Sequence, residues 1–191
     1  MKHNWTTTKL IAVGAFGVLR VLIWLPFVAI NISTSSPLLL IFSFFFFSLI
    51  SVFSLLTIRQ FGTVTIQTFV EWVLELPLPS IAFMPLLFAA AIIRALVVDL
   101  LFFFLRTKEA AASIVCGGAN SLVLSALTYV VYLVMGIPGT QTIPSAIFTP
   151  IGLLLASTVV FDLGSTGGYT GYLVYKKMAN TAVMRRIQGA Q

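Results

Sequence analysis

Charged residues are scarce in this sequence. Of its 191 residues only 8% are Asp, Glu, Lys or Arg, whereas 59% are hydrophobic, and the mean hydropathy is +1.08. A soluble domain needs about 25% charged residues to cover its surface. The outer surface of this chain must therefore meet lipid, and the composition predicts an all-α integral membrane protein.

Cysteine and histidine are almost absent, with Cys116 and His3 the single examples of each. An internal disulfide is excluded, and metal sites or catalysis that need clustered Cys or His are nearly excluded. The chain has no G-x-x-x-x-G-K-[ST] and no H-E-x-x-H motif. We therefore expect no enzyme, no cofactor and no metal. The net charge of +6 is spread over the ends of apolar runs, which argues against nucleic acid as a partner.

Six apolar runs are candidates for membrane spans, because a helix needs about 20 apolar residues to cross a hydrocarbon core about 30 Å thick. They cover about residues 10–30, 38–58, 63–76, 81–105, 111–135 and 147–175. The third run is the shortest and contains Glu71 and Glu75. The sequence thus predicts one domain over residues 1–191, a bundle of six transmembrane helices.

The basic residues fix the expected orientation. Outside the spans, Lys and Arg occur only in the two tails and in the second and fourth connections: Lys2, Lys9, Arg59, Arg106, Lys108, Lys176, Lys177, Arg185 and Arg186. Six spans with both termini in the cytoplasm place every one of these charges inside, as the positive-inside rule expects. Five or seven spans would divide them between the two sides.

Charged residues within the spans are costly, and they are candidates for function. They are Arg20, Glu71, Glu75, Arg94, Asp99 and Asp162. Buried ion pairs that hold the bundle together, such as Arg94 with Glu71 and Arg20 with Asp162, are one interpretation. A functional role is the other. The sequence leaves both open for Arg20, Arg94, Asp99 and Asp162.

The third run carries the best ligand-binding candidates. Glu71 and Glu75 lie four residues apart and share a helix face, with Trp72 alongside. Two carboxylates beside an aromatic ring suit a cationic or hydrogen-bonding aromatic ligand, and Arg94 is expected at a similar depth. Further candidates occur at outer helix ends and in the last outer connection: Trp24, Tyr129, Tyr132 and Gln141. The aromatic residues among them could equally be interfacial anchors.

Small residues gather in two runs. Gly164, Gly167, Gly168 and Gly171 form two overlapping G-x-x-x-G pairs in the sixth run, which favour close helix packing within the bundle. The first run is similarly smooth at Ala12, Gly14, Ala15 and Gly17. These residues could pack inside the bundle or dock another membrane protein.

The glycine-rich sixth run passes into a basic tail, Gly167-Gly168-Tyr169-Thr170-Gly171-Tyr172-Leu173-Val174-Tyr175-Lys176-Lys177. Together with six short spans and inner termini, this resembles an S component of an energy-coupling factor (ECF) transporter. Residues 44–106 are most similar to the hydroxymethylpyrimidine/thiamine-related group. The matching features are the Arg-x-x-Gly turn at Arg59–Gly62, Val70-Glu71 before a Pro-containing turn, and a later apolar helix that ends in Asp99 and Arg106.

This resemblance implies a subunit of the prokaryotic plasma membrane that captures a vitamin or vitamin precursor from outside. It implies ATP-driven uptake, after docking through the first helix on a transmembrane coupling protein that works with two ATPase subunits. Glu71 becomes the leading pocket residue. The family's Ala-x-x-x-Ala docking pattern is not matched, because Ala12 and Ala15 are three apart and Ile11 and Phe16 are large.

Two other functions stay open. A self-sufficient small transporter or channel should show inverted repeats, and we find no internal repeat. A ligand-free membrane assembly subunit is the second alternative. The identity of the substrate and the use of a dedicated or shared coupling module are not fixed by the sequence.

Overall fold

The structure is a computed structural model that describes residues 5–34, 38–76, 85–135 and 150–189. Within these ranges the chain is helical, joined by short turns. The helices are α1 (Thr7–Thr34), α2 (Leu38–Ile58), α3 (Thr63–Glu75), α4 (Pro85–Leu105), α5 (Glu109–Met135), α6 (Pro150–Met178) and α7 (Ala182–Gln188). The all-α prediction is confirmed.

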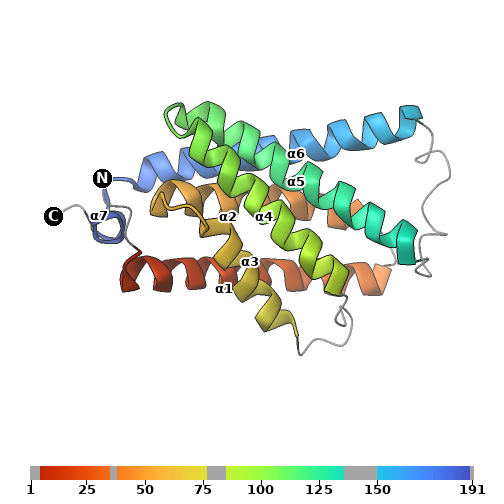
Figure 1. The fold of residues 1–191 in the computed structure, drawn as a ribbon, viewed down its shortest axis with the longest axis horizontal. Coiled ribbons are helices and arrows are strands. Elements are labelled where there is room, and N and C mark those ends of the chain that lie inside the picture. The colour runs from red at the N-terminus through yellow and green to blue at the C-terminus, as the bar shows by residue number, and fades with distance from the viewer. Residues whose placement is uncertain (1–4, 35–37, 77–84, 136–149, 190–191) are drawn as a thin grey trace.

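The first six helices lie side by side along the long axis, and the chain alternates between the two ends of the bundle (Figure 1). The start of α1, the α2–α3 turn, the α4–α5 turn and α7 share one end, which we call the basic end because Arg59, Arg106 and Lys108 lie in its turns. These basic turns thus lie at one end of the bundle.

Within the described residues, four helices are long and apolar enough to cross a membrane: Thr7–Phe27, Pro85–Leu105, Glu109–Val131 and Ile151–Met178. The apolar segment Phe42–Ile58 of α2 is shorter. Helix α3 has only 13 residues, so it extends over about 20 Å and does not cross a core about 30 Å thick by itself. The six runs are therefore six helices, of which α3 is the exception in length.

The glycines of α6 set its position in the bundle. Gly164 and Gly168 face α5, and Gly167 and Gly171 face α2. A Cβ on any of the four would meet a backbone carbonyl oxygen of the neighbouring helix, so α6 approaches both helices at backbone contact. The predicted packing role of the two G-x-x-x-G pairs is confirmed, with each pair serving a different neighbour.

Asp99 of α4 fixes the beginning of α3. Its carboxylate accepts hydrogen bonds from the backbone N–H of Val64 and of Thr65, each at 3.0 Å, and from the Thr65 hydroxyl at 2.7 Å. A negative charge at a helix N-terminus is favoured by the exposed N–H groups and the helix dipole. Asp99 is therefore a structural residue that caps a neighbouring helix. The preceding turn needs left-handed backbone at Arg59 (φ 54°) and Gly62 (φ 88°).

The C-terminal helix α7 was not expected from the sequence. Its signals are local: the Thr181 side chain accepts from the backbone N–H of Met184 as an N-cap, and Gly189 ends the helix in left-handed conformation (φ 72°). Met184 is buried in the core, and Gln188 donates to the Tyr175 hydroxyl at 3.2 Å. Helix α7 thus closes the basic end of the bundle.

Candidate functional site

Helices α1, α3 and α4 bring four charged side chains together inside the bundle: Arg20, Glu71, Glu75 and Arg94. We call them the ionic cluster. All four are buried, at between 1% and 7% exposure. Arg20 Nη2 lies 3.1 Å from Glu71 Oε2. Two cations and two carboxylates in one buried group balance in formal charge, which is the condition for keeping charges in a low-dielectric interior.

Thr68 links the two arginines. Its hydroxyl oxygen accepts from Arg20 Nη1 at 3.3 Å and from Arg94 Nη2 at 2.8 Å. The Nε atoms of Arg20 and Arg94 are buried and find no hydrogen-bond partner within the described ranges. The cluster therefore keeps unused donors although its charges balance.

Glu75 is the carboxylate that is not directly engaged. It interacts electrostatically with Glu71, Arg20 and Arg94, but the part of the chain that the structure describes gives it no hydrogen bond or ion pair at contact distance. It is the last residue of α3, at the end away from the turn that Asp99 caps. The Glu75 carboxylate can therefore accept a hydrogen bond from a further donor.

The ion pairs expected from the sequence are wrong. Arg20 pairs with Glu71, while Arg94 reaches Thr68. Asp162 is exposed on α6, and the helices that pack on α6 are α2 and α5, so Arg20 on α1 is out of its reach. The position of a charge in its helix predicts its depth but not the direction in which its side chain points, and this direction decides the partner.

One aromatic ring contacts the cluster directly, and others lie near it. The Arg20 guanidinium lies over the Phe47 ring, 4.7 Å from its centroid, and Trp24 packs on the same ring at 5.5 Å. Trp72 contacts Phe88 of α4, also at 5.5 Å. Trp24 therefore joins the cluster through one intervening ring, and Trp72 lies on the α3–α4 contact rather than over the carboxylates.

Three other candidates are not placed at the cluster. Tyr129 is partly buried on α5, which packs mainly against α2, α4 and α6. The side chain of Tyr132 and all of Gln141 lie outside the described residues. Thr68 and Phe47 were missed in the sequence, although Thr68 shares a helix face with Glu71 and Glu75 through its spacing of three and seven residues.

The small residues of α1 divide between two sides. Gly17 is buried against α3, where an added Cβ would lie 2.9 Å from Val70 Cβ. Ala15 is exposed, and a Cβ on Gly14 would meet nothing within 4 Å. Ala12 is intermediate in exposure. Large apolar residues continue the exposed side: Ile11, Val18, Leu19 and Leu22. The outer face of α1 is thus apolar, with one patch of small residues at Gly14 and Ala15.

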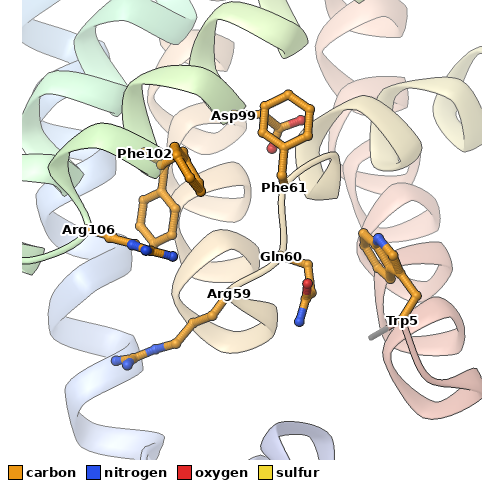
Figure 2. A pocket seen from close by; sticks show the side chains of 8 residues that line it. Trp5, Arg59, Gln60, Phe61, Asp99, Phe102 and Arg106 are labelled. Carbon is orange, nitrogen blue, oxygen red and sulfur yellow. The ribbon is translucent and has the colours of Figure 1, made fainter. Parts of the chain in front are cut away.

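A cavity of about 300 Å³ opens at the basic end, away from the ionic cluster (Figure 2). Its walls come from the start of the chain, the α2–α3 turn and the end of α4: Trp5, Arg59, Gln60, Phe61, Asp99, Phe102, Phe103 and Arg106. The Asp99 carboxylate already accepts three hydrogen bonds from the start of α3. Arg59 points toward α6 in Figure 2, where it pairs with Glu109 and donates to the Tyr175 hydroxyl. The charged side chains Asp99 and Arg59 that line the cavity are therefore already held by contacts within the fold.

These features define a class: a multi-pass helical membrane protein with a charge-balanced ionic cluster inside a six-helix bundle. Neither a protein-family model nor a curated protein sequence matches the chain. A solved structure described as the crystal structure of an S-component of an ECF transporter has the same fold. The TM-score is 0.64 at 19% identity, over 96% of this chain and 90% of that one. This chain therefore has the fold of an ECF S component.

Proposed function

We propose that this chain is the substrate-binding S subunit of an ECF-type importer in a prokaryotic plasma membrane. The observation that carries the proposal is the fold, which matches an S component over 96% of the chain. Residues 1–191 form one membrane domain with both termini in the cytoplasm. The substrate is a vitamin or vitamin precursor, with a thiamine- or hydroxymethylpyrimidine-like compound favoured.

The ionic cluster supports this class of substrate. Glu75 has no direct partner within the described ranges, so its carboxylate is available to a cationic ring or to the amino group of an aminopyrimidine. Glu71 is engaged by Arg20 and acts by holding the cluster. Trp24 and Trp72 supply aromatic surface nearby. Glu75 therefore takes the leading role that the resemblance gave to Glu71.

Calorimetric titration of the purified chain with thiamine, its pyrimidine precursor, riboflavin, biotin and folate tests the substrate. We expect binding of a pyrimidine-containing compound and a loss of at least about tenfold in affinity for Glu75→Gln, because a hydrogen bond to a charged group contributes about 1.5–3 kcal/mol. Glu109→Gln, which changes an acidic residue at the basic end, is the matched control and should bind like the parent.

An anionic vitamin would reverse this dependence. If Glu75→Gln bound as tightly as the parent while Arg94→Gln did not, the preference for a cationic or aminopyrimidine ligand would be wrong. Arg94→Gln keeps a donor toward Thr68, so its effect on folding should be smaller than that of an apolar substitution. Failure of every compound to bind or to stabilise the protein against heat would favour a ligand-free assembly subunit.

The exposed face of α1 is the proposed contact with the coupling protein. Its patch of Gly14 and Ala15 permits close approach of another helix. Ala15→Trp should prevent co-purification with a coupling protein and two ATPases, while substrate binding stays intact. Gly17 packs on α3 and is not part of this surface. Substrate uptake by proteoliposomes that contain this chain alone would instead identify a self-sufficient transporter.

The proposed orientation has a direct test. Single cysteines at Thr107 and at Ser35, in a Cys116→Ala background, should react with a membrane-impermeant maleimide from opposite sides. Labelling of Ser35→Cys in intact cells, and of Thr107→Cys only after lysis, is the result expected for cytoplasmic termini. The reverse pattern would contradict it.

A further inference from the structure

Helix α6 carries an ionisable residue on the side that faces away from the bundle. Asp162 is exposed. The other charged residues within the apolar runs of the sequence are all buried: Arg20, Glu71, Glu75, Arg94 and Asp99. Asp162 therefore differs from every other charge at this depth, and the packing of the bundle does not account for it.

The azimuth of Asp162 directs its side chain away from α2. Gly171 lies nine residues further on, which is half a turn beyond two full turns at about 100° per residue. Gly171 packs on α2, so Asp162 points in the opposite direction, away from α2. The part of the chain that the structure describes offers its carboxylate no hydrogen bond and no ion pair.

At its depth in the membrane, the Asp162 carboxylate does not reach water. It lies 14 residues before Lys176, which is about 21 Å along the helix axis. Lys176 is in the last turn of α6 and marks the boundary at the basic end. In a hydrocarbon core about 30 Å thick, Asp162 is then about 9 Å from the opposite boundary, beyond the reach of its short side chain.

The neighbours on this face do not satisfy the carboxylate. Thr158 and Thr166 lie one turn to either side, but each donates its hydroxyl to a backbone carbonyl four residues earlier, at 2.9 and 2.8 Å. Leu155, Val159 and Leu173 on the same face are exposed and apolar. Ser165 and Tyr169 also lie on this face, but Ser165 Oγ has no hydrogen-bond partner within the described ranges and the Tyr169 ring packs on Tyr172. A single carboxylate thus stands at the centre of an otherwise lipid-compatible surface.

This chain does not itself contain the missing cation. It has 11 Lys and Arg residues, and the two within the spans, Arg20 and Arg94, are buried in the ionic cluster. The others lie in the tails and connections or at the end of α6. A second copy of the chain therefore brings no exposed cation to the depth of Asp162.

We propose that the outer face of α6 around Asp162 docks a transmembrane helix of another protein, and that this helix carries an Arg or Lys at membrane depth. The pair forms across the interface, with the apolar residues of the face packed around it. Charge complementarity indicates a cationic partner. An isolated carboxylate in lipid is costly, so its pairing with a cation is strongly favoured. The surface lies on α6 and is separate from the face of α1 discussed above.

Photo-crosslinking from α6 tests this interface in the native membrane. A benzophenone amino acid replaces Val159 in the full-length chain, and the crosslinked peptides are sequenced by mass spectrometry. We expect an adduct with a transmembrane segment that contains Arg or Lys within its apolar run. Asp162→Asn should lower the yield about tenfold, as expected for loss of an interhelical polar contact, and Asp162→Glu should restore it.

A defined probe gives a second measurement. The purified chain is reconstituted in phosphatidylcholine vesicles with a polyleucine helix that bears a central Arg, and association is followed by fluorescence energy transfer. The same peptide with Leu in place of Arg is the control. Selective binding of the Arg peptide that Asp162→Asn abolishes supports the proposal. Adducts only with lipid or with a second copy, or equal association of both peptides, would overturn it.

Discussion

Replacing Arg20 by methionine removes the cation from a buried pair while it keeps most of the side-chain volume. The pair joins α1 to α3, with side-chain exposures of 1% for Arg20 and 7% for Glu71. In the single variant Arg20→Met, Glu71 keeps its charge and loses its ion pair. In Glu71→Met, the Arg20 guanidinium stays between Thr68 and Phe47 without its carboxylate.

The magnitude follows from this burial. Breaking one partner of a buried pair costs about 3–5 kcal/mol, because an uncompensated charge is left inside, whereas replacing both partners by apolar residues is often nearly neutral. Each single variant should therefore lower the free energy of unfolding by about 3–5 kcal/mol. The double variant Arg20→Met/Glu71→Met should be more stable than either single one.

Reversible unfolding in bicelles by steric trapping measures these free energies. Trp24 is a convenient reporter because it packs on Phe47, the ring beneath Arg20. The reasoning would be refuted if the effects of the two single variants simply added in the double variant. It would also be refuted if each single variant cost less than about 1 kcal/mol, as an exposed pair does.

Substitutions at three further residues test the packing of the bundle by the same unfolding measurement. Asp99→Ala should cost about 2–5 kcal/mol, because it leaves two N–H groups at the start of α3 without an acceptor, and Asp99→Asn should cost less; equal stability of all three proteins would contradict the capping role. Gly167→Val should destabilise by several kcal/mol, about 3 or more, because its side chain would meet the backbone at Phe45, and Gly167→Ala should be intermediate. Arg59→Gln should cost only about 0–1 kcal/mol, since its ion pair with Glu109 has side-chain exposures of 52% and 34%; a large loss would show that the turn depends on this pair.

Much of the fold could be predicted from the sequence because hydrophobicity and charge act locally along a membrane helix. The lengths of the apolar runs fixed the helices to within a few residues, as with α3, expected at 63–76 and found at Thr63–Glu75. Helix α7 was missed because seven residues are too few for a clear apolar period. The spacing of the α6 glycines indicated close packing correctly.

The assignment of binding residues stays a prediction, but the structure shows which of the charged candidates lie together. Glu71 and Glu75 were expected to share a helix face and Arg94 to lie at about the depth of Glu71, and the structure brings all three together with Arg20 on three helices. The pairing of Arg20 with Glu71 and the bridging role of Thr68 could not be foreseen. Depth follows from the position of a residue in its own helix, whereas contact also needs the rotation of each helix about its axis.

By itself, the sequence determined that this chain is an all-helical membrane protein and, to within a few residues, where its six long apolar runs form helices. Both follow from the cost of placing charge and unpaired backbone groups in lipid. Only the tertiary structure decided the role of each buried charge. Asp99 became a helix cap, Arg20 and Glu71 a pair, and Asp162 an outward-facing carboxylate. These roles depend on which helix lies beside which and on the direction in which each side chain points.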